Sequence, residues 1–289
     1  MNKLFFTSET ANKINKIKDK EPINFDLNKT KNKLLVEKKE AKVIINLTNI
    51  EKSEKSNKIE FDEKEFKNLK ESFVYVIEDK EIKRIELFGE ETNLYYKLLP
   101  TKDWPTLTLS SVPMHRWKYI TPKEDTLSKI REISPVKGRV LDTCCGLGYT
   151  TISEASIAEV EQVDVFERDK NVLRICEYNP YSEQLFINKK IFIHNESVYY
   201  GIEKFKEETF DRIIHDPPTP TFAKELYSIE FYHELYRVLK KGGILYHYAP
   251  QPGKTKGIIT YPHWIKLLEQ VGFKKVKYNE KSSGIKAIK

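Results

Sequence analysis

Three acidic residues in this chain follow short apolar segments, and the residues around them suit each one to bind a ligand. Asp142 is the first of them, and it precedes a turn that contains Gly146 and Gly148. Glycine lets a backbone approach a ligand at points where a side chain would collide. Glu167 follows Asp142 by 25 residues, and a carboxylate there can accept hydrogen bonds from both hydroxyls of a ribose. Together these residues predict a site that binds a nucleoside-containing cofactor.

Asp216, the third acidic residue, begins the segment Asp-Pro-Pro-Thr over residues 216–219. Its carboxylate and the carbonyl of Pro217 form a pair of acceptors that can bind both hydrogens of an exocyclic amino group on a base. Such a group is a poor nucleophile because its lone pair is delocalised into the ring, and this binding frees the lone pair. The prolines fix φ and keep the preceding residue out of the helical region, so the acceptors are held in place. Asp216 also fits a second interpretation, in which it caps the next helix and the two prolines end a strand.

A nicotinamide dinucleotide is the main competitor for the glycine turn. Its binding motif requires a third glycine, where this chain has Tyr149, Thr150 and Thr151. Asp142, four residues before the first glycine of the turn, would repel a pyrophosphate. A carboxylate at that point suits a cationic sulfonium or an ammonium group. The residues of the turn therefore disfavour an anionic ligand.

Alternating strands and helices must position the residues that carry this chemistry. From residue 139 onward the alternation predicts βαβ units and a mostly parallel sheet in an α/β fold. Only residues 280–284 separate the last two strands, so no helix lies between them. We therefore expect a closing antiparallel hairpin and seven strands in all. The predicted strands span 139–143, 163–167, 190–194, 210–215, 243–248, 274–279 and 284–288. The predicted helices span about 150–158, 170–179, 198–205, 222–240 and 261–270.

Three segments of the chain differ in composition. Residues 1–100 predict a small β-rich accessory domain, with a helix that begins near Thr7 or Ser8. Residues 101–138 are rich in proline and aromatic residues, and they predict a connector that ends in a helix before the main fold. Residues 139–289 hold the three acidic residues and form the predicted catalytic domain. Within the accessory domain the predicted strands span 42–48, 72–78 and 81–88.

Composition narrows the class of protein. Hydrophobic residues make up 39% of the chain, enough for a packed core, and no apolar run approaches the roughly 18 residues of a membrane span. The 3 cysteines have neither a disulfide pattern nor metal-ligand spacing, so we expect a reducing cytoplasm and no metal. The net charge of +7 favours a polyanionic partner such as RNA, although a lysine-rich surface alone would give the same charge.

From about residue 115 to residue 289 the chain resembles the class I S-adenosylmethionine-dependent methyltransferases. It is most similar to an archaeal group of predicted methyltransferases that share three motifs. These are Met-His-Arg at 114–116, Asp-Thr-Cys-x-Gly-Leu-Gly-Tyr-Thr at 142–150 and His-Asp-Pro-Pro-Thr at 215–219. The resemblance implies a seven-stranded Rossmann-like sheet that ends in an antiparallel hairpin. It also implies S-adenosylmethionine as the cofactor.

The same resemblance assigns parts of the cofactor to individual residues. It implies that Asp142 and the two glycines of the turn surround the methionine portion, that Glu167 binds the ribose and that Glu196 lies near the adenine. Cys144 departs from the superfamily, which usually has glycine there, and we expect a slightly tighter pocket. The complete set of predicted cofactor-binding residues is Asp142, Cys144, Gly146, Leu147, Gly148, Glu167, Arg168, Glu196, Ser197 and Asp216.

The segment 216–219 resembles the Asp/Asn-Pro-Pro-aromatic motif of enzymes that methylate exocyclic amino groups of bases. Thr219 replaces the aromatic residue that stacks on a flipped base, and Phe222 or Tyr248 is expected to provide that platform. We therefore predict that Asp216 and Pro217 are catalytic. The predicted substrate-binding residues are His115, Arg116, Pro218, Thr219 and Phe222.

Other nucleophilic and titratable residues have structural interpretations. Methylation of pyrimidine C5 needs a cysteine nucleophile, but Cys144 and Cys145 belong to the cofactor turn and Cys176 lies inside a predicted helix. We expect all three to pack in the interior. His215 directly precedes Asp216, and alternation along a strand predicts that it points into the packing layer of the sheet.

The predicted function is an S-adenosylmethionine-dependent methyltransferase that modifies an exocyclic amino group in ribosomal or transfer RNA. Cytosine N4, adenine N6 and guanine N2 are the candidate positions. RNA is the expected partner, and the accessory domain is expected to help hold it. The alternatives are an aminopropyltransferase that uses decarboxylated S-adenosylmethionine, a protein N-methyltransferase, and an RNA-binding protein with a degenerate pocket.

Overall fold

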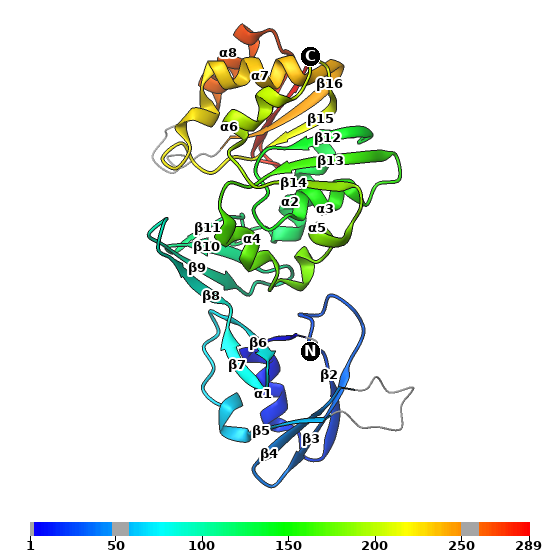
Figure 1. Ribbon diagram of the computed structural model, residues 1–289, viewed down its shortest axis with the longest axis vertical. Coiled ribbons are helices and arrows are strands. Elements are labelled where there is room, and N and C mark those ends of the chain that lie inside the picture. The colour runs from blue at the N-terminus through cyan, green and yellow to red at the C-terminus, as the bar shows by residue number, and fades with distance from the viewer. Residues whose placement is uncertain (1–2, 48–57, 250–259) are drawn as a thin grey trace. The chain divides into compact units, whose positions relative to one another are not determined.

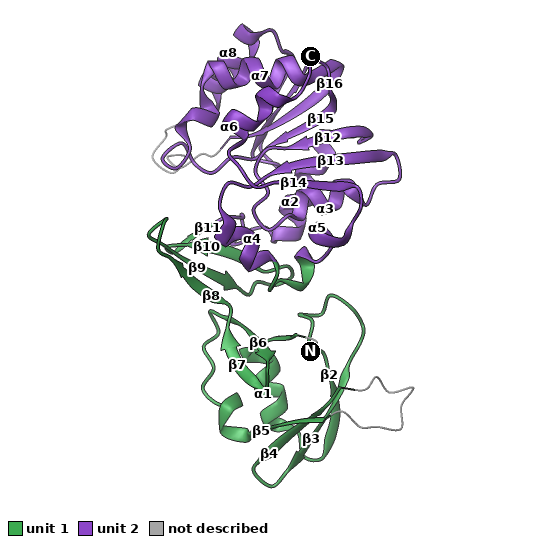
Figure 2. Ribbon diagram, viewed as in Figure 1, with its two compact units in different colours: residues 1–113, 177–181 green, residues 114–176, 182–289 purple. Residues whose placement is uncertain are grey.

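The computed structural model describes residues 3–47, 58–249 and 260–289, and the chain forms two compact units. Unit 1 consists of residues 1–113 with 177–181, and unit 2 consists of residues 114–176 with 182–289 (Figure 2). The sequence places the end of the accessory domain at residue 100. Unit 1 continues to residue 113, because β10 (Thr106–Leu109) pairs with β9 (Leu94–Leu99). The predicted strand 42–48 ends at Thr48, which lies outside the described residues.

Unit 2 is built on a seven-stranded sheet with the strand order β14-β13-β12-β15-β16-β18-β17. The first five strands in this order pair in parallel, and β18 pairs antiparallel with both β16 and β17. The predicted α/β fold with a closing antiparallel hairpin is therefore confirmed. The strands are β12 (Gly138–Asp142), β13 (Val160–Phe166), β14 (Ile191–His194), β15 (Phe210–His215), β16 (Leu239–Tyr248), β17 (Lys274–Asn279) and β18 (Gly284–Ile288).

Helices cover both faces of this sheet (Figure 1). Successive strand residues point to opposite faces, so Leu141 packs with α7 and α8, whereas Val140 packs with α2 and α3. Within the described ranges, no helix is long and apolar enough to cross a membrane. The helices are α2 (Pro122–Glu132), α3 (Tyr149–Ala155), α4 (Lys170–Cys176), α5 (Gln184–Ile187), α6 (Val198–Gly201), α7 (Ile229–Val238) and α8 (Tyr261–Val271), with 3₁₀ helices η2 (Pro180–Ser182), η3 (Ile202–Lys204) and η4 (Lys224–Tyr227).

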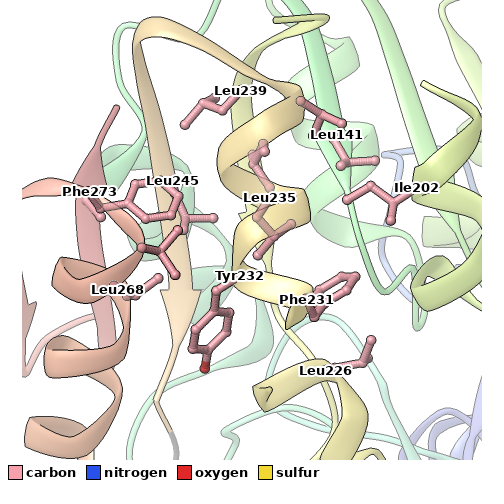
Figure 3. Close-up of a cluster of buried hydrophobic side chains, with 14 of the residues drawn as sticks. Leu141, Ile202, Leu226, Phe231, Tyr232, Leu235, Leu239, Leu245, Leu268 and Phe273 are labelled. Atoms are coloured by element: carbon pink, nitrogen blue, oxygen red, sulfur yellow. The ribbon is translucent and has the colours of Figure 1, made fainter. Parts of the chain in front are cut away.

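The cluster beneath α7 and α8 is the larger hydrophobic core of unit 2, and Figure 3 shows how helix and strand side chains meet in it. Leu141 of β12, Leu235 of α7 and Leu245 of β16 have no exposed surface. Burying one such side chain contributes roughly 1.5–3 kcal/mol to stability. This packing fixes the central strands, whose carboxyl ends carry the predicted site.

The longest predicted helix, 222–240, is wrong in its extent. Ser228 divides it, because the Ser228 hydroxyl accepts a hydrogen bond from the Phe231 N–H and caps α7. Residues before Ser228 form only the 3₁₀ helix η4. Leu239 begins β16 instead of continuing the helix, and it pairs with Phe210 of β15. Pairing within the sheet overrides the helical periodicity of the sequence at this end.

Unit 1 contains, in its described part, three antiparallel sheets and helix α1 (Ser8–Lys16). Thr7 caps this helix, as the sequence predicts, by accepting a hydrogen bond from the Thr10 N–H at 3.5 Å. The predicted hairpin forms between β6 (Val74–Glu78) and β7 (Glu81–Arg84). Its second strand is shorter than the predicted 81–88, because residues 86–89 form a separate strand that pairs with β9 in another sheet. The other elements are β1 (Leu4–Thr7), β2 (Lys20–Ile23), β3 (Leu34–Lys39), β4 (Lys42–Asn46), β5 (Lys58–Asp62), η1 (Glu63–Phe66), β8 (Glu86–Gly89) and β11 (Val112–Pro113).

Gly201 of α6 allows Phe166 of β13 to pack closely against the helix. A Cβ atom at residue 201 would lie 2.3 Å from Phe166 Cε1, and Phe166 is only 1% exposed. We expect Gly201→Ala to lower the free energy of unfolding by about 1–3 kcal/mol in urea denaturation, because the added methyl group overpacks the core. Tyr200→Ala, at a neighbouring residue that is 69% exposed, should change it by less than about 0.5 kcal/mol. An equal loss in both variants would contradict this account.

Candidate cofactor and acceptor site

Asp142 holds the turn that follows β12 against the start of α3. Its Oδ2 atom accepts hydrogen bonds from the hydroxyls of Thr150 and Thr151, each at 2.7 Å, and its Oδ1 atom accepts one from the Cys144 N–H at 3.4 Å. Asp142 has no exposed surface, and burial raises its pKa to about 6 although these hydrogen bonds oppose the shift. The residue therefore shapes the predicted cofactor turn from within.

Two glycines with left-handed backbone angles form the turn itself. Gly146 has φ of +52° and Gly148 has φ of +75°, a region that other residues rarely adopt. Gly148 is the N-cap of α3, and a Cβ atom there would lie 3.1 Å from the side chain of Leu185. Leu147 is buried between the glycines, and the Ser182 hydroxyl donates to its carbonyl at 2.7 Å. Leu147 thus supports the turn from the core.

Glu167 lies at the carboxyl end of β13 and faces the same turn. Its Oε2 atom accepts a hydrogen bond from the Gly146 N–H at 3.1 Å, and its Oε1 atom accepts one from the Asp169 N–H at 2.9 Å. Burial raises the pKa of Glu167 to about 7, and the two backbone donors only partly offset this shift. Asn195 donates its side-chain amide to the Glu167 carbonyl at 2.6 Å. The ends of β13, β14 and the glycine turn are therefore tied together at the predicted ribose residue.

Three acidic side chains act electrostatically on the Cys144 thiol. Burial raises its pKa well above the ordinary value, and the charges of Glu167, Asp142 and Asp216 raise it further. These acids come from the ends of β13, β12 and β15. The carboxyl groups of Glu167 and Asp142 suit a cationic ligand and oppose a pyrophosphate, whereas Asp216 is paired with Lys129. These acidic side chains therefore fit the sulfonium and the ribose hydroxyls of S-adenosylmethionine, as the sequence predicts.

Glu196 and Ser197 follow β14 at the same edge of the sheet, where the sequence places the adenine. Glu196 forms an ion pair with Lys204 at 2.6 Å, and its side chain is 36% exposed. The Ser197 carbonyl accepts the first hydrogen bonds of α6 from the N–H groups of Tyr200 and Gly201. Contact between either residue and the adenine stays a prediction.

Arg168 connects the end of β13 to the segment that follows β15. It donates to the Phe222 carbonyl at 3.0 Å and contacts Glu225 at 3.4 Å. Phe222 has a side chain on the surface, since the residue is 43% exposed. Arg168 therefore contacts the segment that carries the predicted substrate residues.

Asp216 forms a close ion pair that the sequence analysis did not predict. The Lys129 ammonium of α2 donates to Asp216 Oδ2 at 2.6 Å. Lys129 also lies 2.9 Å from Asp125, one turn earlier on α2. Burial raises the pKa of Asp216, and the Lys129 charge opposes this shift. The predicted catalytic carboxylate is thus anchored at one oxygen by a buried lysine.

The interpretation of Asp216 as a helix cap is wrong. The next α-helix, α7, is capped by Ser228, and η4 begins after Ala223. The Tyr227 hydroxyl instead donates to the Pro218 carbonyl at 2.9 Å, and the Thr219 carbonyl accepts from the Phe222 N–H at 2.8 Å. The segment 216–219 is therefore a loop in which the carbonyls of Pro218 and Thr219 accept hydrogen bonds.

Tyr248 is one of the aromatic residues near Asp216. Lys129 Nζ lies 5.3 Å from the centroid of its ring, and the negative charge of Asp216 adds to the effect of burial in raising the pKa of Tyr248. Of the two expected stacking platforms, Tyr248 lies at the carboxylate, whereas Phe222 lies on the loop next to Arg168. The contact of either ring with a base stays a prediction.

The predicted packing roles of His215, Cys145 and Cys176 agree with the structure, whereas Cys144 is only partly buried. His215 has no exposed surface; its ring nitrogens lie 2.8 Å from the Thr143 hydroxyl and 2.9 Å from the Leu226 carbonyl. Burial lowers its pKa well below the ordinary value, so the ring is neutral. Cys145 and Cys176 are buried, and burial raises the pKa of the Cys145 thiol.

The Met-His-Arg motif lies over the cofactor turn. A Cβ atom at Gly146 would lie 3.4 Å from Met114 Sδ, and the His115 ring packs against Tyr149 of α3 at 5.1 Å between centroids. Burial lowers the pKa of His115 to about 4. Arg116 contacts Asp125 at 2.5 Å and donates to the Ser283 hydroxyl at 2.7 Å. The motif therefore joins the turn, α2 and the closing hairpin.

Sequence reasoning missed Lys129 and Asn195. Asp125 and Lys129 are four residues apart in a predicted helix, a spacing that favours an ion pair on an exposed face. The structure buries that face, and the lysine reaches β15, which is 87 residues away in the chain. Asn195 binds a backbone carbonyl through a tertiary contact that no local pattern encodes.

The Methyltransferase small domain family model matches residues 126–279, which include β12 to β17. An uncharacterized protein of Methanocaldococcus jannaschii is 40% identical over 288 residues, covering 99% of this chain and 95% of that protein. A polyamine aminopropyltransferase of Prochlorococcus marinus (strain MIT 9515) is 30% identical over 148 residues, which span half the length of each protein.

Two solved structures have a similar fold. A spermidine synthase in complex with a transition state analogue has a TM-score of 0.55 at 18% identity, covering 70% of this chain and 71% of that chain. The spermidine synthase of Thermotoga maritima has a TM-score of 0.54 at 18% identity, covering 70% of each chain. At this identity the likeness extends to the fold alone. The family match and the glycine turn with its strand-end acids place this chain in the Methyltransferase small domain family, within the class I S-adenosylmethionine-dependent methyltransferases, with S-adenosylmethionine as its cofactor.

Proposed function

We propose that this chain transfers a methyl group to an exocyclic amino group of a base in ribosomal or transfer RNA, in the cytoplasm. Cytosine N4, adenine N6 and guanine N2 are the candidate positions. The proposal depends on Asp216 and Pro217, which follow β15 directly beside the cofactor turn that follows β12. These strands pair in parallel, and the Thr143 N–H donates to the Ile214 carbonyl at 3.0 Å just before both loops.

The residues of the chain supply position and polarity for this reaction. When bound, S-adenosylmethionine supplies an electrophilic methyl group on a sulfonium. Glu167 would hold the ribose hydroxyls, and the carboxylates around Cys144 favour the positive charge of the cofactor. Asp216 and the Pro217 carbonyl would bind the amino hydrogens and direct the nitrogen lone pair, which is the positioning that such a transfer needs. The nitrogen gains a bond to carbon and loses a proton, for which Asp216 is the adjacent base.

Aminopropyl transfer is the second candidate, and two observations favour it. The aminopropyltransferase of Prochlorococcus marinus is 30% identical over half of its length, and a spermidine synthase has a similar fold over 70% of this chain. In that reaction Asp216 would act as the base toward an alkyl amine. The two candidates differ in the cofactor, because aminopropyl transfer uses decarboxylated S-adenosylmethionine.

A direct assay separates these candidates. The full chain is incubated with S-adenosylmethionine labelled in its methyl group and with unmodified ribosomal and transfer RNA, and the digested nucleosides are identified by mass spectrometry. A methylated amino group on one nucleoside is the expected product. A parallel reaction contains decarboxylated S-adenosylmethionine and 1,4-diaminobutane. Product in the second reaction alone would overturn the proposal in favour of aminopropyl transfer.

RNA binding should weaken steeply with salt, because lysine and arginine side chains that contact phosphates release bound counterions. The net charge of +7 supports such contacts. We expect affinity for the substrate RNA to fall about tenfold between 50 and 200 mM salt for every two phosphate contacts, as measured by filter binding. Binding of S-adenosylmethionine over the same range is the internal control and should change far less. Equal salt dependence of the two ligands would contradict a large RNA substrate.

A further inference from the structure

Four ionisable side chains form a continuous series that ends at Asp216, the first residue of the loop 216–219. Arg116 contacts Asp125 at 2.5 Å, Asp125 contacts Lys129 at 2.9 Å, and Lys129 contacts Asp216 at 2.6 Å. The side chains of Asp125 and Lys129 are 1% and 4% exposed, whereas that of Asp216 is 22% exposed. Asp216 is therefore the carboxylate of this series that a substrate can reach.

Lys129 and Asp125 each favour the charged form of the other in this arrangement. Burial alone would lower the pKa of Lys129, but the carboxylates of Asp125 and Asp216 raise it above its ordinary value. Burial alone would raise the pKa of Asp125, but Lys129 and Arg116 hold it below its ordinary value. Two basic side chains thus face two acidic ones along this series. Replacing all members of such a buried ion cluster together by apolar residues is often neutral or stabilising, so the fold alone gives little reason for a charged cluster here.

We propose that Lys129 is a specificity-determining positioning residue, which offsets the negative charge of Asp216. The site then admits an uncharged amino group and rejects a protonated alkyl amine. This inference rests on the proposed function and narrows its substrate class. Lys129 acts through Asp216, to which it is bound, and not by touching the substrate.

The hydrogen-bond pattern of Asp216 fits an uncharged amino group. Lys129 occupies Oδ2, and among the described residues none donates a hydrogen bond to Oδ1. The amino group of a base needs such an acceptor oxygen and no net opposing charge. An alkyl amine has a pKa of about 10.4 and is a cation at neutral pH. It would meet a carboxylate that is already neutralised, with the Lys129 charge close by, and would lose its hydration without compensation.

The test measures binding of 1,4-diaminobutane by calorimetry in the presence of saturating S-adenosylmethionine. The wild-type chain should give no saturable heat up to about 1 mM diamine, the weak limit of specific affinity. Lys129→Met leaves Asp216 without its cation and should bind the diamine with a Kd of about 0.1 mM or less, at least tenfold below the 1 mM limit for wild type, because one like charge is removed. Lys129→Arg retains the charge and should restore the rejection.

A matched control is Lys123→Met, which removes the same charge from an exposed position on the same helix. It should bind the diamine no better than wild type. Saturable diamine binding by the wild-type chain, or no gain in a folded Lys129→Met chain, would overturn the inference. If Lys129→Met fails to fold, Asp125→Asn combined with Lys129→Met makes the same measurement without leaving Asp125 unpaired.

The outcomes also separate this inference from the proposed function. Rejection of the diamine by wild type, gain in Lys129→Met and no methylation of RNA would leave Lys129 as the filter for an uncharged amino group while refuting the RNA substrate. RNA methylation together with tight diamine binding by the wild-type chain would refute the role of Lys129 alone.

Discussion

Asp216→Ala is expected to lower the rate of methyl transfer to RNA by about 10²–10⁴-fold, while the affinity for S-adenosylmethionine stays within a few-fold. The carboxylate is the group that would orient the amino nitrogen, whereas the cofactor is held chiefly by the glycine turn and Glu167. Lys129 keeps Asp125 as a partner at 2.9 Å, so the substitution leaves no isolated buried charge. Single-turnover transfer and calorimetric titration measure the two effects separately. Wild-type turnover by this variant would refute the assignment of the Asp-Pro-Pro segment.

Asp216→Asn distinguishes orientation of the lone pair from removal of a proton. The amide oxygen still accepts a hydrogen bond from the amino group, so some activity should remain if orientation dominates. An amide cannot take up a proton, so a general base would lose nearly all activity. Asp211→Asn is the matched control at the other end of β15, where Asp211 pairs with Lys240 at 2.7 Å. That variant should lose stability and keep its rate of transfer.

The sequence predicts unit 2 better than unit 1, and the reason is the kind of pairing that each contains. The buried strands of a parallel sheet are short apolar runs separated by helices, and all seven were recognised with small errors in their ends. The strands of unit 1 are partly exposed and polar. β2, for example, has the sequence Lys-Glu-Pro-Ile, and its strand conformation comes from pairing with β3. Such strands depend on tertiary pairing more than on local pattern.

The candidate site was predictable where its residues follow strands in the chain. Asp142, Glu167 and Asp216 each end or follow a strand, and parallel neighbours bring those ends together, so their convergence follows from topology. Lys129 was not predictable, because it precedes the sheet and reaches Asp216 only through the packing of α2. A lysine four residues after an aspartate is equally typical of a solvent-exposed helix.

Binding of S-adenosylmethionine should strengthen about tenfold between pH 6 and pH 8 and become constant above pH 8. Burial raises the pKa of Glu167 to about 7, so at pH 6 the carboxyl group of the free chain is largely protonated. Ribose hydroxyls and a sulfonium both favour the ionised form, and the cofactor must therefore displace the proton at low pH. Calorimetric titration at several pH values measures this dependence.

Two substitutions at residue 167 test whether this carboxylate is the cause. Glu167→Ala should weaken binding at pH 8 by about 1–3 kcal/mol through the loss of charge-assisted hydrogen bonds. Glu167→Gln should remove the pH dependence above about pH 7, and the remainder at lower pH would come from Asp142, whose pKa is raised to about 6. An unchanged pH profile in Glu167→Gln would refute the assignment.

Thermal unfolding provides an independent check on the same group. The native chain binds the Glu167 proton more tightly than the unfolded chain, in which the glutamate has its ordinary pKa of 4.5. The native state therefore loses stability relative to the unfolded state as the pH rises from about 4.5 through about 7. Glu167→Gln has no such titrating proton. The melting temperature of the variant minus that of wild type should therefore increase from pH 5 to pH 8 in the absence of cofactor. A carboxylate that was ionised throughout, with an ordinary pKa, would leave the difference between the two melting curves independent of pH.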